Sequence, residues 1–213
     1  MNKIFFAVII AFLVISCEEE QISYSCDPEI DAIVKSGVIE SSQLDLSELL
    51  EYDIQLQKAI YRSMSPQKKK AIWIERLDKI MTNKDFSLME LGHIDKLKTY
   101  VMQDSFDPSK DDQEILDVRK AIENEWKKIA IDKLNWDLSK VGFMVSSLYV
   151  SELKYQETIQ DQIGLTLEML EADCSCSSES SYCGGPACIV GGCTETSACG
   201  WLWQYSCDGY CNY

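Results

Sequence analysis

The chain has 213 residues and a formal net charge of −15, from 35 acidic and 20 basic residues. This balance argues against nucleic acid as a partner, because phosphate binding needs clustered lysines and arginines. Every Lys and Arg precedes Ala172, whereas eight of the ten cysteines follow it. These two asymmetries predict a boundary at Glu171–Ala172.

The N-terminus has the organisation of a bacterial export signal. Lys3 precedes an unbroken apolar run over 4–15, which is too short to span a bilayer. The motif Leu-Val-Ile-Ser-Cys at 13–17 resembles a lipobox, in which cleavage follows Ser16 and the thiol of Cys17 is acylated. The alternative is an ordinary secretory signal that contains a cysteine. The lipobox implies an exported protein anchored by a lipid at Cys17 to the outer membrane or cell surface.

Three glutamates, Glu18 to Glu20, follow Cys17 directly. Acidic residues at this place resemble the surface-export signal of Bacteroidota-type lipoproteins. A solvated linker is the alternative interpretation, and the sequence does not choose between the two.

Residues 27–171 combine charged and apolar residues at helical spacing, with few glycines. This pattern predicts a mainly α fold, a small helical bundle or a helical stalk. Expected helix starts are Ser47, Ser65-Pro66 and Asp107-Pro108, since Ser and Asp cap free N–H groups and Pro fits the first helical position. Further helices are expected over 86–103 and 151–170, while 141–150 reads as a helix or a buried strand. The stripe expected for the longest helix is Ile115, Val118, Ile122, Trp126, Ile129 and Leu134.

No catalytic constellation stands out in the sequence. The only histidine is His93, and the zinc-protease, serine-hydrolase and nucleotide-binding motifs are missing. We therefore expect no enzyme, no cofactor and no metal site. The basic run Lys68 to Lys70 is expected to form a solvated face, with processing or partner contact as the alternative.

The tail, residues 172–213, is too short to bury enough surface by itself. Its even cysteine count in an exported chain predicts disulfides. Zinc is the alternative, but the tail has no CxxC pair and no histidine. Cys174 and Cys176 are expected to have different partners, and no partner is assigned to Cys26. The predicted disulfide cysteines are Cys174, Cys176, Cys183, Cys188, Cys193, Cys199, Cys207 and Cys211.

The tail resembles the fulvocin C-related bacteriocins. The likeness lies in Cys-Ser-Cys-Ser-x-x-Ser-x-Tyr-Cys at 174–183, the Ala172-Asp173 pair before it, Ala198-Cys199, the aromatics near Trp203 and an Asn-Tyr ending. It covers about a fifth of the chain, and the spacings shift after Cys188. The region around Ser65-Pro66 to Ile72-Trp73 is similar to the helical leader of these proteins. The resemblance implies a ribosomally made, disulfide-rich antibacterial peptide.

The tail also holds a dense group of aromatic residues. Such rings suit a membrane interface or a receptor surface, although they could instead pack over the disulfides. Because the tail has four acids and no base, attraction to anionic lipid cannot drive its binding. The candidate contacts with a target or membrane are Trp201, Trp203, Tyr205, Tyr210 and Tyr213.

Two functions follow from these patterns. In the first, the chain is a bacteriocin precursor whose tail is cut off near Glu171-Ala172 by a processing protease, acts on an unidentified component of the target-cell envelope, and is countered by an immunity protein. In the second, it is an uncleaved surface lipoprotein whose tail is a binding or structural module. The predicted segments are a signal peptide (1–16), an acidic linker (17–26), a helical leader or stalk (27–171) and the bacteriocin-like tail (172–213).

Overall fold

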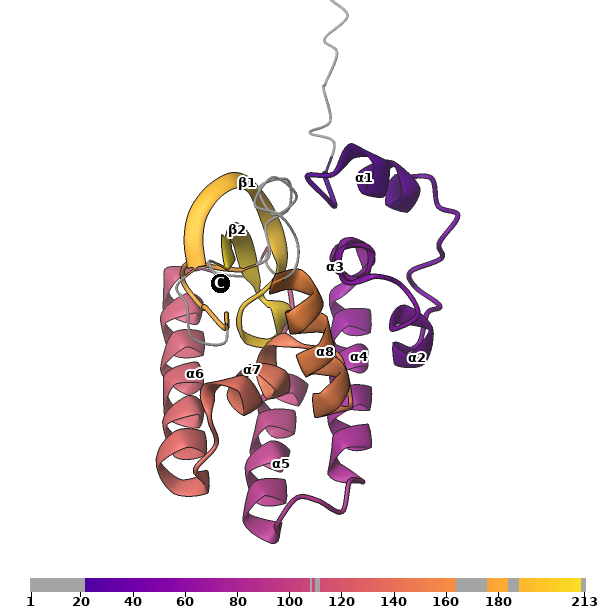
Figure 1. Ribbon diagram of the computed structural model, residues 1–213. Coiled ribbons are helices and arrows are strands. Elements are labelled where there is room, and N and C mark those ends of the chain that lie inside the picture. Colours follow the sequence, from indigo (N-terminus) through magenta and orange to yellow (C-terminus); the bar gives the residue numbers. More distant parts are fainter. Residues whose placement is uncertain (1–21, 108, 110–111, 164–175, 184–187, 212–213) are drawn as a thin grey trace, which may run out of the picture.

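The computed structural model describes residues 22–107, 109, 112–163, 176–183 and 188–211 (Figure 1). Within 158–163 and 192–196 it describes the backbone alone. Ser16, Cys17, Glu171, Ala172 and Tyr213 lie outside the described residues.

Helices make up most of the described chain, which confirms the expected mainly α class. None of the described helices combines the length and apolar character that a bilayer crossing requires. The helices are α1 (Pro28–Lys35), α2 (Leu46–Leu49), α3 (Ile54–Ser63), α4 (Pro66–Met81), α5 (Leu88–Gln103), α6 (Gln113–Leu134), α7 (Leu138–Ser146) and α8 (Glu152–Ile163).

Side-chain caps set where these helices begin. Ser65 accepts a hydrogen bond from the N–H of Lys68 and is followed by a proline, so the start of α4 is confirmed. The helix expected from Ser47 is instead two helices. The carboxylate of Asp53 accepts hydrogen bonds from two N–H groups and begins α3 anew. Similarly, α6 begins after Asp112 instead of Asp107, because the Asp112 carboxylate caps the N–H of Ile115.

The ambiguous stretch 141–150 is helical up to the end of α7 and irregular after it. The reason is the guanidinium of Arg76 on α4, which is fully buried. It donates to the carbonyls of Phe143 (2.5 Å), Met144 (2.8 Å) and Tyr149 (3.1 Å). The carbonyls at the end of a helix lack partners within the helix, so this side chain terminates α7 and fixes the following turn.

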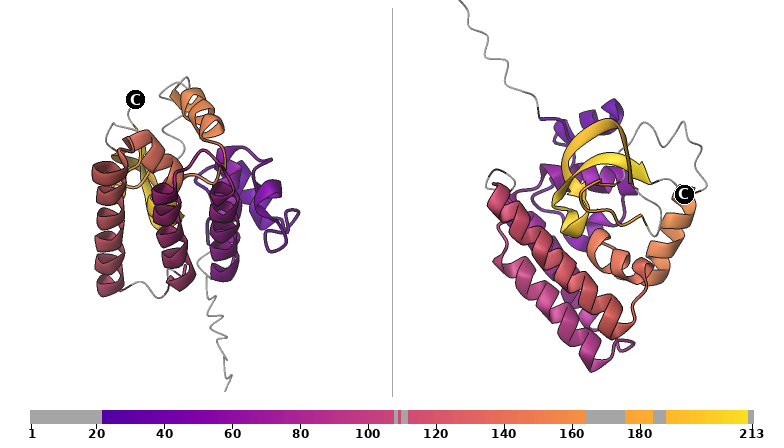
Figure 2. Two further views of the ribbon diagram at one scale, coloured as in Figure 1. Left: turned by 90° about the horizontal axis from the view of Figure 1, so that it is seen from below. Right: turned by 90° about the vertical axis from the view of Figure 1, so that its left-hand side faces the viewer.

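The tail forms an antiparallel hairpin on the helices. Strand β1 (Cys188–Cys199) pairs with β2 (Tyr205–Cys211), and a 3-10 turn, η2 (Trp201–Trp203), lies between them. A single bridge from Cys176 to Gly209 adds a third segment. The hairpin lies between α6 and α3 (Figures 1 and 2), so the last described residues, 188–211, pack beside helices from earlier in the chain.

Replacing Arg76 with methionine is expected to lower the free energy of unfolding by about 2–4 kcal/mol, because three buried carbonyls lose a charged donor. Urea denaturation followed by circular dichroism measures this loss. Lys96→Met is the control, since Lys96 is an exposed cation on α5. Equal losses in both variants would contradict a capping role for Arg76.

Candidate functional site

The candidate site is the contact between the tail and the helices. At its centre lies the plug, defined as Trp201, Leu202 and Trp203 of η2. All three side chains are at most 1% exposed and belong to the same hydrophobic core as the helices. The helical segment and the tail therefore share one core.

The plug fits into a socket of four aromatic residues, each from a different helix. Trp203 meets two of the rings edge-on, with centroids 5.1 and 6.4 Å away, and Trp201 meets the other two at 5.3 and 6.2 Å. Three of the four pairs are edge-to-face and the fourth, Tyr100 with Trp201, is tilted at 59°. Edge-to-face pairs at these distances stabilise a core by more than the burial of their apolar area alone. The socket consists of Tyr61 (α3), Trp73 (α4), Tyr100 (α5) and Trp126 (α6).

A disulfide closes the loop that carries the plug. Cys199 and Cys207 are bonded across η2, and both are buried. Inside the loop Leu202 and Trp203 have positive φ angles of 53° and 56°, a conformation that costs energy for residues with side chains. The disulfide and the socket together hold the loop in this shape.

Glycine is required at position 200, next to the plug. Gly200 has a φ of 65°, and a Cβ there would lie 2.7 Å from the Cβ of Ser180. The neighbouring Ser180 hydroxyl in turn accepts the N–H of Trp201 at 2.9 Å. The close approach of the two tail segments thus fixes where η2 begins.

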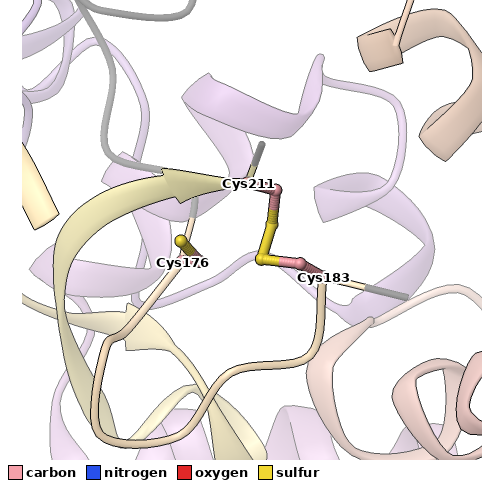
Figure 3. A group of neighbouring side chains, drawn as sticks. All are labelled: Cys176, Cys183 and Cys211. Atoms are coloured by element: carbon pink, nitrogen blue, oxygen red, sulfur yellow. A yellow bond between two sulfur atoms is a disulfide. The ribbon is translucent and has the colours of Figure 1, made fainter. Parts of the chain in front are cut away.

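Two further disulfides hold the rest of the tail. Cys176 is bonded to Cys188 and Cys183 to Cys211. The sulfurs of Cys176, Cys183 and Cys211 lie within 4.8 Å of one another (Figure 3). Zinc ligation needs thiolates, and these sulfurs are already engaged in S–S bonds, so this group is part of the covalent framework.

Six of the eight predicted cysteines are therefore confirmed in disulfides. Cys174 lies outside the described residues, and so does the side chain of Cys193. Cys26 is exposed, and none of these three disulfides includes it.

Trp201, Trp203 and Tyr205 lie inside the core of the intact chain, so their contact with a target or membrane stays a prediction for a released tail. Their exposed fractions are 0%, 1% and 5%. The rings are buried because the helices offer apolar partners and a polar one: the indole N–H of Trp203 donates to the carbonyl of Ser146 at 2.8 Å. Tyr210 is half-buried.

A single carboxylate ties the tail to α6. Glu123 is 6% exposed and accepts hydrogen bonds from the hydroxyls of Ser180 (2.7 Å) and Tyr182 (2.8 Å). Burial and the charge of Glu123 both raise the pKa of Tyr182, so its hydroxyl remains a donor at every physiological pH.

The buried face of α6 explains why sequence reasoning missed Glu123. Its buried residues are Arg119, Glu123, Trp126 and Ala130, whereas Ile115 and Val118 of the expected stripe are 39% and 55% exposed. The face is thus rotated from the apolar stripe towards two charged residues. The available signal was the spacing of these four residues, which follow one another along the helix at steps of four, three and four, although only the contact with the tail explains why two of them are charged.

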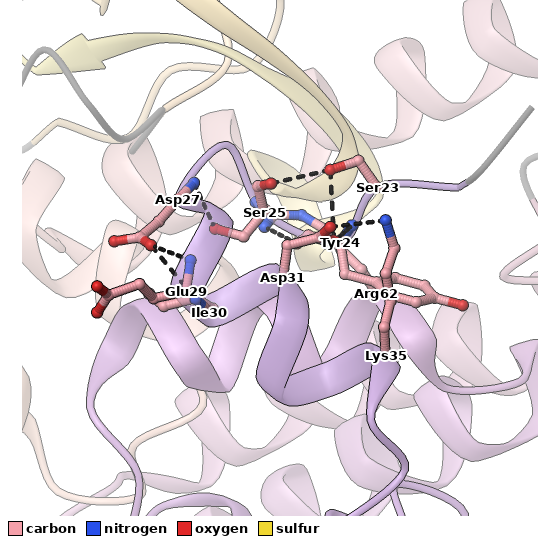
Figure 4. Close-up of polar contacts among 9 residues, drawn as sticks. All are labelled: Ser23, Tyr24, Ser25, Asp27, Glu29, Ile30, Asp31, Lys35 and Arg62. Carbon is pink, nitrogen blue, oxygen red and sulfur yellow. Dashed lines mark hydrogen bonds and ion pairs between the residues drawn. The ribbon is translucent and has the colours of Figure 1, made fainter.

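Two cations of α3 lie against the disulfide of the plug loop. Arg62 donates to the carbonyl of Ser197 (2.9 Å) and to the sulfur of Cys207 (3.3 Å), and the ammonium of Lys58 lies 3.7 Å from the sulfur of Cys199. Arg62 also donates to the carbonyl of Tyr24 at 2.7 Å (Figure 4). This side chain therefore joins the tail, α3 and the segment before α1.

Lys69 lies beside the socket at a small cavity that Tyr61, Ser197 and Trp203 also line. The sequence predicts a solvated face for Lys68 to Lys70, but Lys69 is only 7% exposed because α4 turns it towards the ring of Tyr61. Burial, aided by the nearby charge of Arg62, lowers the pKa of Lys69 to about 8.

Trp203→Ala is expected to lower the free energy of unfolding by about 3–5 kcal/mol, since a fully buried ring is lost from the core. Tyr210→Ala, which removes a half-buried ring of the same hairpin, should cost clearly less. Thermal and urea denaturation of the oxidised proteins would measure both. A larger loss for Tyr210→Ala would contradict the placement of the plug.

Lys69→Met should change stability in a pH-dependent way. The pKa of about 8 in the folded chain is below the ordinary value of 10.5, so the contribution of Lys69 to stability rises between pH 8 and 10.5. Hence the variant should exceed the parent by about 1–2 kcal/mol at pH 7 and lose this advantage by pH 10. Urea titrations at several pH values test this, with Lys68→Met as control; a gap independent of pH would contradict it.

Comparison with protein-family models, with curated proteins and with solved structures finds no match for this chain.

Proposed function

We propose that the chain is the precursor of a disulfide-rich antibacterial peptide, exported as a lipoprotein and cut near Glu171-Ala172. The observation that carries the proposal is the internal closure of the tail. All three described disulfides join residues within 176–211, so cutting the connection frees the tail without breaking them. Through these three bonds, residues 176–211 are closed on themselves.

The helices give such a precursor a means of staying inactive. A free tail would expose two tryptophans and a leucine that the socket now covers. An exposed apolar group of this size favours insertion at membrane interfaces or association with other proteins. Covering it keeps the tail soluble until the peptide is released, and the acidity of the tail leaves the aromatic side as its means of contact.

A second function is an uncleaved surface lipoprotein. The observation that favours it is the depth of the plug, because a peptide destined for release here completes the core of its own precursor. In this case the tail stays attached and stabilises the domain that it forms with the helices. The lipid at Cys17 holds that domain at the cell surface.

Mass spectrometry of a bacterial host that expresses the full chain separates the two functions. The precursor predicts a free 172–213 fragment in the medium, eight hydrogens lighter than its reduced mass if all eight cysteines pair. Acylated full-length protein in the envelope, with no such fragment, would favour the uncleaved lipoprotein. A Cys17→Ser chain is the control that removes the acylation site.

The isolated fragment should inhibit growth of a bacterial lawn only in its oxidised form, because the disulfides hold the aromatic loop in shape. A fragment with Trp201→Ser and Trp203→Ser is the control that keeps every cysteine. Equal potency of the oxidised and reduced fragments would remove the role of the disulfides, and inactivity of both would remove the antibacterial function.

A further inference from the structure

We propose that the socket binds the oxidised tail without the peptide link, so that the helical segment of one copy captures the tail released from another. The inference rests on the proposed cleavage. It gives the helical segment, left on the membrane by its lipid, a second role as the protector of the producing cell.

The contact has the character of a protein–protein interface. The plug contacts the helices through ring contacts and a hydrogen bond, all of them non-covalent, and its two tryptophans are buried at the centre of the contact. Buried tryptophans of this kind dominate binding energy at interfaces. Because the chain connection supplies none of these contacts, cutting it leaves all of them in place.

Four hydrogen bonds, made by three residues on separate helices, fix the orientation of the tail. Glu123 on α6 accepts two hydroxyls, the carbonyl of Ser146 on α7 accepts the indole N–H of Trp203, and Arg62 on α3 donates to a tail carbonyl. A different apolar ligand would leave these buried groups without partners, at a cost that discriminates against it. The socket is therefore specific for this tail.

The socket also distinguishes the oxidised from the reduced tail. Lys58 and Arg62 contact the two sulfurs of the Cys199–Cys207 disulfide, so the S–S bond itself lies in the interface. This bond closes the loop that presents both tryptophans. A reduced tail has to order the loop on binding, and this ordering weakens its affinity.

Charge complements shape at this surface. The tail has no basic residue, and buried cations at positions 58 and 62 face it from α3. On α6 the helix presents a negative charge instead, because the carboxylate of Glu123 faces two hydroxyl donors of the tail. At these two points the helices thus present a polar group that matches the part of the tail facing it.

Exchange between two cut copies tests the proposal. A protease recognition sequence is inserted between Glu171 and Ala172 of the full chain, and the protein is prepared with and without ¹⁵N label and then cut. We expect the halves to co-elute under native conditions. After mixing, native mass spectrometry should detect labelled helices carrying unlabelled tails. Uncut proteins mixed in the same way are the control and should form no hybrids.

Separation of the halves on cutting, or failure of hybrids to form over days in a stable cut complex, would overturn the inference. Growth inhibition is a separate readout. Hybrids without any antibacterial activity would leave the binding site standing and remove the proposed function. Antibacterial activity without hybrids would leave the proposed function standing and remove the binding site.

Variants on α6 test the polar specificity. Glu123→Ala should speed the loss of the tail by about 10-fold or more, because two hydrogen bonds to a charged group are lost. Glu125→Ala is the matched control, since Glu125 is exposed two residues along the same helix. Glu123→Gln, which keeps the volume, serves if the alanine variant does not fold when uncut. Equal rates for positions 123 and 125 would contradict the assignment.

The double variant Cys199→Ser, Cys207→Ser in the cut chain tests whether the socket recognises the disulfide-closed loop. Its hybrids should dissociate at least about 10-fold faster than those of the parent, because loop ordering now opposes binding. Unchanged rates would overturn the claim that the socket recognises the oxidised loop.

Discussion

Two tryptophans from the end of the chain fill the centre of a core that the helices otherwise build. The socket residues are drawn from four helices, so the position of each of these helices depends on the plug. Removal of a buried ring of this size costs about 3–5 kcal/mol, a large part of the net stability of a domain. The tail is thus part of the hydrophobic core that holds the helical segment together.

Much of the helical segment follows from local chemistry and was predictable. The Ser65-Pro66 start is confirmed because capping depends on a few neighbouring residues. The Asp53 and Asp112 caps were missed because apolar periodicity continues across them, and a competing carboxylate decides the boundary. The end of α7 depends on Arg76, about seventy residues away in the chain, which no local pattern reveals.

The candidate site was predictable in its covalent part and not in its surroundings. Cysteine spacing and length were enough to expect disulfides, and six of the cysteines are confirmed in them. The aromatic residues were identified, but their burial depends on partners more than 50 residues away in the chain. The role of Glu123 depends on the two hydroxyls of the tail that donate to it. Neither the sequence of α6 nor that of the tail could therefore identify it by itself.

The contact of Arg62 with Tyr24 has a consequence for geometry at the cell surface. With Cys17 acylated as proposed, seven residue steps separate the lipid from Tyr24, a reach of at most about 25 Å. Arg62 hydrogen-bonds both to Tyr24 and to Ser197 of the hairpin. A lipid at Cys17 would therefore keep the hairpin side of the protein close to the bilayer. If the tail is released there as proposed, it first meets the membrane of the producing cell, at high local concentration, before it can diffuse to any other cell.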